Sequence, residues 1–390
     1  MKRLQQVLPC LLLALLGGCS TVLPPRPAVP VVPVAPPAPA ATHQPALPDP
    51  MPPPVGALLR GKSRWVAADW RELPGFEADA LHEAWNAFVK SCERPNPSFA
   101  PLCPEVRRLS IGDAAAQRDW LQQRLQPYRV EPLQGPVTAG LLTAYFEPEF
   151  AASRLPDADF RVPMYQPPGG LSVGKAWFSR RDIDTQPQAQ AALRGKEIVY
   201  LADPVQALVL QIQGSGRVRV SEPDGTQRLL RLAYAGNNGW AYQSVGRWLL
   251  DQGELQDASW PGIANWLAKN PQRVNELLWT NPRVVFFKEE PLGEFDAAFG
   301  PRGAQGVALT PGRSIAVDPD SIPYGTPVWL ASQGSSATLQ RLVLAQDTGN
   351  AISGALRADY FVGWGVVAGE LAGRMKQPLQ LWVLWPKPPG

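Results

Sequence analysis

The chain has 390 residues, in which 37 lysines and arginines stand against 34 aspartates and glutamates, for a formal net charge of +3. So small a charge argues against a nucleic-acid partner, which requires a concentrated basic face. Only two histidines are present, His43 and His82. This scarcity nearly excludes a histidine-based triad or a histidine-rich metal site, and it leaves carboxylate chemistry as the strongest candidate. We therefore expect no metal and no cofactor.

The first segment predicts export and lipid attachment. A short basic start precedes an apolar stretch at residues 7–16 that is too short to span a bilayer. The sequence LGGC at 16–19 resembles the lipobox of bacterial lipoproteins, in which Cys19 is acylated and residues 1–18 are removed as the signal peptide. Ser20 follows instead of Asp, which under the sorting rule of those lipoproteins implies the outer membrane, facing the periplasm of a Gram-negative bacterium. The alternative is an ordinary signal peptide with an incidental cysteine.

Residues 19–55 are expected to form a tether behind the lipidated cysteine. Pro, Ala and Val dominate residues 24–54, and charge is scarce there. Such a segment cannot form a core and favours an extended, polyproline-like chain with a reach on the order of 90 Å. It would let a lipid-anchored domain search a nearby layer. No later segment is long and apolar enough to cross a membrane.

Two cysteines remain once Cys10 is removed with the signal peptide and Cys19 is acylated. Cys92 and Cys103 close a Pro-rich loop, and in an oxidising periplasm we expect them to pair. The pairing would contribute about 3 kcal/mol by the chain-entropy estimate. Two free buried thiols are the alternative.

Helices are expected first along the folded part of the chain. Leu81, Trp85 and Phe88 recur at i, i+4 and i+7, so residues 77–91 should form an amphipathic helix with His82 on its flank. A second helix is expected over residues 114–125.

A mixed region follows, and then a β-rich one. The residues at 140–148 indicate a strand running into a turn. Further strands are expected near 198–201, 208–213, 217–220 and 228–233, and helices near 241–250, 263–269 and 272–279. From residue 283 the pattern predicts strands at 284–287, 314–317, 327–330, 341–345 and 379–384, separated by Gly/Pro turns as in a small barrel.

Three aspartates stand in apolar, glycine-punctuated settings in the last third of the chain. Asp318 precedes Pro319, Asp347 follows the apolar strand at 342–345, and Asp359 precedes the apolar YFVGW sequence. A carboxylate at the end of a buried strand is costly unless it has partners, and an apolar setting raises its pKa. The alternative for each is an aspartate that caps a turn. The DTG sequence at 347–349 also matches the aspartic-protease tripeptide, but that fold needs two such aspartates and this chain has one copy.

Residues 211–217, QIQGSGR, form a glycine-rich segment. They lack the Gly-Lys-Ser/Thr ending of a phosphate loop, and strands are expected on both sides, so a nucleotide site is disfavoured. Exposed amides with Gln and Ser side chains could bind sugar hydroxyl or N-acetyl groups. A plain glycine-rich hairpin is the alternative.

Several segments together resemble the membrane-bound lytic murein transglycosylase A family. They are residues 140–149, 211–217, 234–239 (YAGNNG), 242–247 (YQSVGR) and 281–287 (NPRVVFF), with a C-terminal block like that family's three-aspartate domain at 316–319, 322–326, 347–352 and 359–363. The match covers roughly residues 130–386. Two departures occur: Ala144 and Asn350 stand where the family often has glycine, and Asn350 could alter the loop beside Asp347.

The resemblance implies a mainly β fold with peripheral helices. It implies a double-psi β-barrel domain with a second, smaller β domain inserted, and a substrate cleft between them. The expected boundaries are residues 56–150 for the N-terminal helical part and first barrel strands, 151–275 for the inserted domain, and 276–390 for the rest of the barrel domain.

The resemblance also implies the reaction, which is cleavage of the β-1,4 bond between N-acetylmuramic acid and N-acetylglucosamine in peptidoglycan strands. The muramyl C6 hydroxyl attacks its own C1 and leaves a 1,6-anhydro end, so one acid can serve where a glycosidase normally needs two. We expect Asp359 to be this acid/base, Asp347 to tune its pKa or stabilise positive charge, and Asp318 to be accessory. The residues expected to hold the sugars are Thr143, Tyr145, Glu147, Gln213, Gly214 and Ser215.

Two questions stay open at this point. A non-catalytic peptidoglycan-binding lipoprotein could use the same cleft, and it is the rival interpretation. Complexes with cell-wall synthesis or division proteins are possible partners, but nothing in the sequence identifies them.

Overall fold

The computed structural model describes residues 57–134, 139–172, 174–256 and 258–388. The predicted signal peptide at 1–18, the acylated Cys19 and the tether at 19–55 lie outside the described residues. In the part of the chain that is described, no helix combines the length and apolar character needed to cross a membrane.

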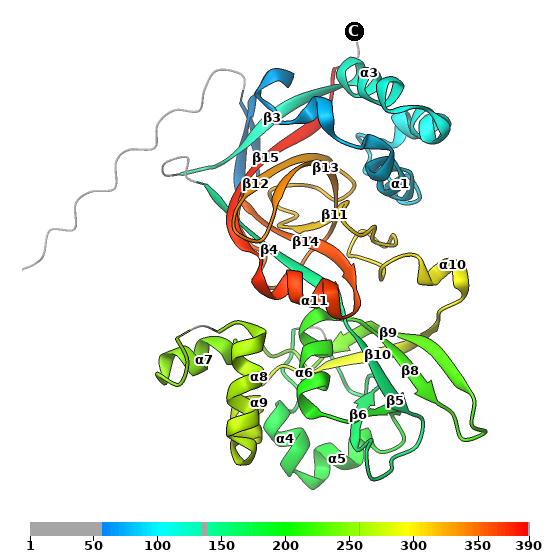
Figure 1. The fold of residues 1–390 in the computed structure, drawn as a ribbon, viewed down its shortest axis with the longest axis vertical. Coiled ribbons are helices and arrows are strands. Elements are labelled where there is room, and N and C mark those ends of the chain that lie inside the picture. The colour runs from blue at the N-terminus through cyan, green and yellow to red at the C-terminus, as the bar shows by residue number, and fades with distance from the viewer. Residues whose placement is uncertain (1–56, 135–138, 173, 257, 389–390) are drawn as a thin grey trace, which may run out of the picture. The chain divides into compact units, whose positions relative to one another are not determined.

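A closed β-barrel lies within the first of two sheets (Figure 1). The sheet runs in the order β1-β2-β3-β15-β12-β13-β11-β14-β4, and an added pairing of β15 with β4 closes the ring β4-β15-β12-β13-β11-β14. The pairs β11–β13 and β14–β4 are parallel, and the other pairs in the ring are antiparallel. The strands are β1 (Leu58–Arg60), β2 (Ser63–Ala67), β3 (Leu125–Pro132), β4 (Gly140–Glu147), β11 (Ser314–Val317), β12 (Pro327–Gln333), β13 (Thr338–Asp347), β14 (Arg357–Trp364) and β15 (Lys376–Pro386).

Alternation along the barrel strands fills the interior. Ile315 and Val317 of β11 belong to one apolar cluster with Leu142, Ala358 and Tyr360, whereas Ala316 between them does not. Successive residues of a strand point to opposite faces, so Ala316 faces outward. The outer face therefore carries the neighbours of Ala316 on the adjacent strands.

The second sheet is inserted in the chain between β4 and β11. Its order is β10-β9-β8-β5-β7-β6, with β5 (Glu149–Ser153), β6 (Val162–Tyr165), β7 (Glu197–Leu201), β8 (Gly216–Ser221), β9 (Gln227–Asn237) and β10 (Val285–Pro291). Strand β4 of the barrel leads almost directly into β5 of this sheet (Figure 1). The predicted architecture, a double-psi β-barrel with a smaller β domain inserted, is thereby confirmed.

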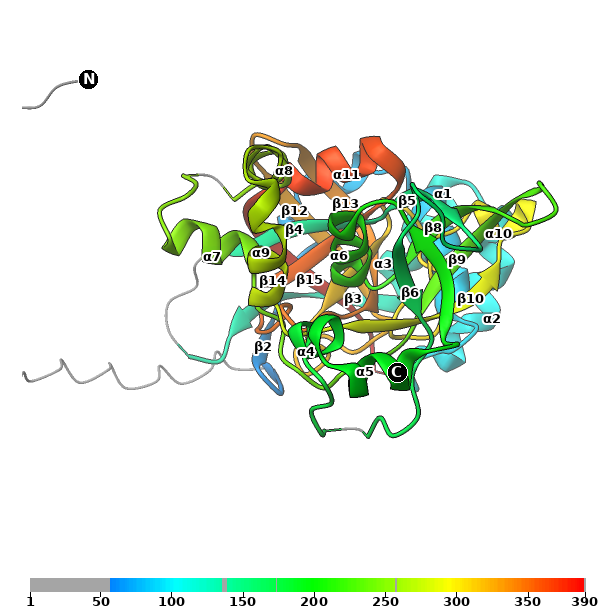
Figure 2. The ribbon, with the colours of Figure 1, turned by 90° about the horizontal axis from the view of Figure 1, so that it is seen from below.

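Helices accompany both sheets, and Figure 2 shows those of the inserted sheet from below. The α-helices are α1 (Leu81–Ser91), α2 (Cys103–Arg108), α3 (Ala114–Arg124), α4 (Arg180–Thr185), α5 (Pro187–Leu193), α6 (Pro204–Gln213), α7 (Val245–Asp251), α8 (Trp260–Lys269), α9 (Val274–Thr280), α10 (Glu294–Ala297) and α11 (Gly365–Arg374). Short 3-10 turns occur at Trp70–Glu72, Phe76–Ala78, Ala100–Leu102, Leu109–Ile111 and Pro271–Arg273.

The N-terminal helices cover one side of the barrel's outer face. Trp85 and Phe88 of α1 are buried in one cluster with Trp329, Leu344 and Trp382 of the barrel strands. The predicted helix at 77–91 is confirmed from Leu81 onward, and His82 is exposed. A disulfide joins Cys92, which follows α1, to Cys103, the first residue of α2, with 5.6 Å between their Cα atoms.

The predicted strand at 208–213 is wrong, because these residues form the second half of helix α6. Asp203 caps the helix by accepting a hydrogen bond from Val205 N (2.8 Å), and Pro204 is its first residue. Leu208 and Leu210 are buried, and Gly214 ends the helix with φ of 80°. The apolar run VLQI has strand-like composition, and packing against neighbouring elements decides for the helix. Strand β14 and helix α11 were not predicted.

Candidate active site

Four residues form a row across the outer face of the barrel. Ala316 on β11 is in register with Asp347 of β13 on one side and with Asp359 of β14 on the other. Asp359 is in turn in register with Thr143 of β4. The two aspartates therefore lie on the two strands that flank β11, with Ala316 between them and roughly 10 Å between their Cα atoms. Ala316, which is buried, contributes only a methyl group between the two carboxyl groups.

A bulge in β13 brings Asp347 into this row. The register with β11 passes from Ile315 opposite Ala345 to Ala316 opposite Asp347, so Gln346 has no partner on β11. Its buried side chain donates to Ala87 O (2.8 Å) and Ser91 Oγ (2.8 Å) of α1. Bulges change the direction of side chains next to active sites. Here the bulge directs Gln346 toward α1 and places Asp347 on the outer face beside Ala316.

The carboxyl group of Asp359 is held by a threonine and an arginine. Thr143 Oγ1 donates a short hydrogen bond to Asp359 Oδ1, and it accepts one from Arg357 Nη2 (2.8 Å). Burial by the surrounding protein raises the pKa of Asp359, and the Thr143 hydrogen bond and the Arg357 charge act against that rise. The residue keeps some exposed surface. A carboxyl group in this setting can hold a proton and still meet a ligand.

Asp347 is fixed by donors on both of its oxygens. Ala304 N donates to Oδ1 (2.9 Å), and the Tyr145 hydroxyl donates to Oδ2 (2.9 Å). Burial raises the pKa of Asp347 to about 6, with Asp359 adding to the rise and the hydrogen bonds from Thr348, Ala304 and Tyr145 opposing it. Burial and the Asp347 charge also raise the pKa of Tyr145 well above its usual value. Tyr145 is therefore a proton donor to Asp347 in a hydrogen bond and is not itself a base.

Asp318 lies outside the row, in an ion pair of its own. It is 2% exposed and accepts hydrogen bonds from Lys62 Nζ (3.0 Å), Gly354 N (2.7 Å) and Asp320 N (3.1 Å). Burial alone would raise the pKa of Asp318, but these hydrogen bonds and the Lys62 charge hold it below its ordinary value. The Asp318 carboxylate therefore favours its ionised form, and its hydrogen bonds link the end of β11 to Gly354 in the loop before β14.

Glu147, expected to contact a sugar, is completely buried where the barrel meets the inserted sheet. Arg217 Nε (2.8 Å) and Arg231 Nη2 (3.2 Å) both donate to it. The same two arginines donate to Phe299 O, where the chain returns to the barrel, and Arg217 also lies 3.8 Å from the ring of Trp364. This placement favours a residue that joins the two sheets over one that meets a ligand.

The other residues expected to contact sugars differ in their hydrogen bonds and in their exposure. Gln213 Oε1 accepts a hydrogen bond from Phe146 N (3.2 Å), so the end of α6 is tied to β4 beside Tyr145. Gly214 keeps some exposure, and Ser215 is buried. Thr143 and Tyr145 contact the aspartates directly.

Asn350 lies in the loop after Asp347. When its side-chain oxygen faces Arg283, this oxygen accepts a hydrogen bond from Arg283 Nη2 (3.1 Å).

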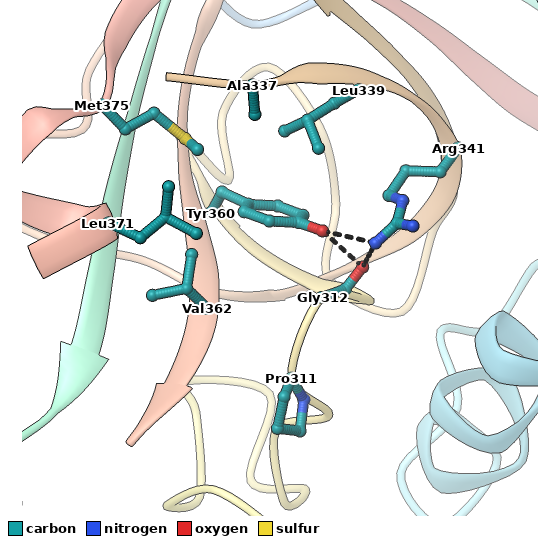
Figure 3. Close-up of a pocket in the computed structure, with 9 residues that line it drawn as sticks. All are labelled: Pro311, Gly312, Ala337, Leu339, Arg341, Tyr360, Val362, Leu371 and Met375. Atoms are coloured by element: carbon teal, nitrogen blue, oxygen red, sulfur yellow. Dashed lines mark hydrogen bonds between the residues drawn. The ribbon is translucent and has the colours of Figure 1, made fainter. Parts of the chain in front are cut away.

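A small cavity of about 320 Å³ lies behind the strand that carries Asp359. Apolar side chains line most of it, with Arg341 and Tyr360 as its polar members (Figure 3). Tyr360 and Val362 alternate along β14 with Asp359 and Phe361, so they project to the other face of the strand. The cavity therefore does not open onto the row of aspartates.

No cluster of three or more His, Cys, Asp or Glu side chains suited to a metal ion occurs among the described residues.

Three residues of the site escaped sequence reasoning. Arg357 and Ala316 are adjacent to the aspartates only through strand register, and Ala304 reaches Asp347 from a loop 43 positions away. The alternation of Arg357, Asp359 and Phe361 was the one sequence signal that could have placed Arg357 on the same face as Asp359.

Two family models match the chain, and they define its class. The MltA specific insert domain matches residues 141–288, and the 3D domain matches residues 313–385. The membrane-bound lytic murein transglycosylase A of Vibrio cholerae is 34% identical over 256 residues, which are 63% of this chain and 65% of that protein.

Solved structures agree with this class. The lytic transglycosylase LtgG of Burkholderia pseudomallei is 40% identical with a TM-score of 0.57, over 86% of this chain and 100% of that one. The structure of Escherichia coli MltA with bound chitohexaose is 25% identical with a TM-score of 0.67, over 83% of this chain and 95% of that one. The chain belongs to the membrane-bound lytic murein transglycosylase A family and carries its C-terminal 3D domain.

Proposed function

We propose that this protein is a peptidoglycan lytic transglycosylase that uses Asp359 as a single general acid/base. It would cleave the β-1,4 bond between N-acetylmuramic acid and N-acetylglucosamine and leave a 1,6-anhydromuramic acid end. The observation that carries the proposal is the setting of Asp359: its carboxyl group has a raised pKa, is partly exposed, and is separated by the single strand β11 from the strand that carries a second carboxyl group. A group that must first give and then take a proton works best with its pKa near the working pH.

The reaction can be written with Asp359 alone as the proton carrier. Protonated Asp359 gives its proton to the glycosidic oxygen as the bond to the muramyl C1 breaks, and N-acetylglucosamine leaves with a hydroxyl group. The muramyl C6 oxygen then bonds to C1, and the ionised Asp359 takes the proton released from that hydroxyl. The proton count of the enzyme is restored, and no water is consumed.

Asp347 is assigned to the charge that develops on the sugar. With a pKa of about 6 it is mostly ionised at neutral pH, and its negative charge favours an oxocarbenium-like C1. The same charge discourages ionisation of Asp359, so the acid keeps its proton until the substrate takes it. Asp318 is assigned a structural role.

The substrate is placed in the cleft between the barrel and the inserted domain. The E. coli relative was solved with chitohexaose, a chain of β-1,4-linked sugars, which supports a glycan strand as the ligand. Gln213 and Gly214, beside Tyr145, keep some exposure, whereas Glu147 and Ser215 are buried. Acylation at Cys19 would hold the protein at the outer membrane, and the tether would let it reach the peptidoglycan layer from the periplasmic side.

Digestion of purified murein sacculi tests the proposal. The wild type should release 1,6-anhydromuropeptides, and Asp359→Asn should lower the rate by at least about a hundredfold. Asp119→Asn, at an exposed position on α3, is the matched control and should keep the wild-type rate. If sacculi bind but no muropeptides appear, the non-catalytic binding lipoprotein is the better interpretation.

A further inference from the structure

We propose that Arg357 is a positioning residue, which sets the direction of the Thr143 hydroxyl and thereby decides which oxygen of Asp359 carries the working proton. This inference rests on the acid/base role proposed for Asp359. No step of the reaction described above requires Arg357, and it lies on the same face of β14 as the acid.

The direction of the hydrogen bonds follows from the chemistry of the three groups. An arginine side chain only donates, whereas a threonine hydroxyl has one hydrogen to donate and lone pairs to accept. Arg357 Nη2 lies 2.8 Å from Thr143 Oγ1, so the hydroxyl accepts there. Its single hydrogen is left for Asp359 Oδ1. Without Arg357 the hydroxyl could turn and accept from a protonated Asp359.

The consequence is a difference between the two oxygens of Asp359. Oδ1 receives the Thr143 hydrogen and cannot also hold a proton in that direction. The catalytic proton is therefore placed on Oδ2, because the Thr143 hydrogen bond occupies Oδ1. A fixed proton position matters because general acid catalysis requires the proton to lie within hydrogen-bond reach of the leaving oxygen.

Arg357 is held rigidly enough to impose this direction. Its Nη1 donates to Ala358 O (2.5 Å) and lies 3.5 Å from Leu141 O on β4. The parallel register of β14 with β4 sets Arg357 opposite Leu141 and Asp359 opposite Thr143. The guanidinium group therefore spans both strands at the point where they carry the acid and its hydroxyl partner.

Arg357 is also the positive charge that acts on Asp359. Thr143 and Tyr145 face the acid from β4, and Asp347 faces it from β13. Lys376 of β15 is in register with Thr143, but it is exposed, and so are Glu370 and Arg374 of α11. Among these groups the Arg357 charge lowers the pKa of Asp359, against the rise caused by burial.

Titration of Asp359 tests the inference without relying on activity. Carbon-detected NMR of labelled aspartate, assigned with Asp359→Asn, gives the pKa in the wild type, Arg357→Gln and Arg357→Lys. We expect a higher pKa in Arg357→Gln and a value near the wild type in Arg357→Lys. Arg341→Gln removes an arginine from β13, which strand β11 separates from β14. The Arg341 side chain donates to Gly312 O and Tyr360, and its loss should leave the titration unchanged.

Kinetics on soluble glycan strands supply the second measurement. We expect kcat of Arg357→Gln to fall about tenfold, the order of one lost charge-assisted hydrogen bond. The alkaline limb of its pH profile should move to higher pH, because activity is lost as Asp359 deprotonates and its pKa is now higher. Arg357→Lys should recover part of both effects.

The outcomes separate this inference from the proposed function. An unchanged Asp359 titration in Arg357→Gln, or a Lys variant identical to the Gln variant in both measurements, overturns the role of Arg357. A wild type that titrates as described but releases no anhydromuropeptides overturns the proposed function alone. If Arg357→Gln does not fold, Thr143→Val breaks the same link from the other side and must raise the pKa of Asp359.

Discussion

Burial acts to raise the pKa of all three aspartates, but the net shift is upward for Asp347 and Asp359 and downward for Asp318. Asp347 and Asp359 have raised pKa values because protein atoms crowd their carboxyl groups more than their donors compensate. Asp318 is more fully enclosed, yet a lysine and two backbone amides lower its pKa. A lysine contacts the Asp318 carboxylate directly, whereas the groups that donate to Asp347 and Asp359 are uncharged. This contact separates an aspartate held in its ionised form from two that can exchange a proton.

The raised pKa of Asp347 makes its ionised form a cost to stability. Because the folded-state pKa is about 6 and the ordinary value is 3.8, the folded protein binds this proton more tightly than the unfolded chain does. The free energy of unfolding should therefore fall as pH rises from about 4 to about 6. The shift corresponds to about 3 kcal/mol for a fully buried group, and to about 2 kcal/mol after allowance for its residual exposure.

Asp347→Asn removes this cost, so the variant should be more stable than the wild type at pH 7 by about 1–2 kcal/mol. Its kcat should fall, because the charge opposite the reacting sugar is lost. Urea unfolding of both proteins from pH 4 to pH 8 measures the difference. A difference that does not grow between pH 4 and pH 6 would show that the Asp347 pKa is not raised.

Strand β11 controls how the two carboxyl groups face one another. Ala316 lies between Asp347 and Asp359 in the row, and Ile315 and Val317 on either side of it point into the barrel. A β-branched residue at position 316 would suit the strand but place methyl groups between the carboxyl groups. We therefore expect a small residue at position 316 to matter for the site more than for the stability of β11.

Ala316→Val should lower kcat at least about tenfold while changing the free energy of unfolding by only about 1–2 kcal/mol. Ile315→Val, on the same strand but facing the interior, is the matched control. It should cost about 1 kcal/mol and leave kcat unchanged. Thermal unfolding and steady-state kinetics on both variants check the separation, and equal kinetic effects at the two positions would contradict it.

Helices and strands whose sequence suits only one kind of secondary structure could be predicted. A segment whose sequence suits both a helix and a strand could not. Helix α1 has a single apolar stripe, and β11, β12, β13 and β15 are apolar runs bounded by glycine and proline, so their positions were close to those observed. Residues 208–213 suit a strand in composition and a helix in spacing, and the Asp203–Pro204 start that favours the helix was overlooked.

The site itself could be predicted only in part. The three aspartates were identified from their apolar settings, and the family resemblance ranked them. The bulge at Gln346, the register that sets Ala316 between two aspartates and the contact of Arg357 with Thr143 depend on how distant strands pair. Strand pairing is decided by packing over the whole barrel, which short sequence patterns do not encode.

At the scale of the whole molecule, one buried ion cluster ties the two sheets together. Glu147 is fully buried and meets Arg217 and Arg231, which are 3% and 6% exposed. It ends β4, one position before the chain passes toward β5, and both arginines also bind Phe299 O on the returning segment. Both crossings between barrel and inserted sheet therefore meet at this cluster, and we expect it to hold the walls of the cleft in place.

Glu147→Gln leaves two buried guanidinium groups without a counter-charge and should cost about 3–5 kcal/mol. Glu149→Gln is the matched control, because its ion pair with Arg219 is partly exposed and should be worth less than about 1 kcal/mol. Urea unfolding followed by tryptophan fluorescence compares them. Similar losses in the two variants would mean that the cluster does not hold the sheets together.

The central claim is that the substrate supplies the nucleophile, so that one acid/base suffices. Digestion of sacculi in water labelled with heavy oxygen tests this claim directly, with the muropeptides analysed by mass spectrometry. We predict 1,6-anhydro products that carry no label at the muramyl C1, since no water enters the reaction. Reducing-end products with labelled oxygen at C1 would contradict the claim and identify a hydrolase in which the second carboxyl group, Asp347, activates water.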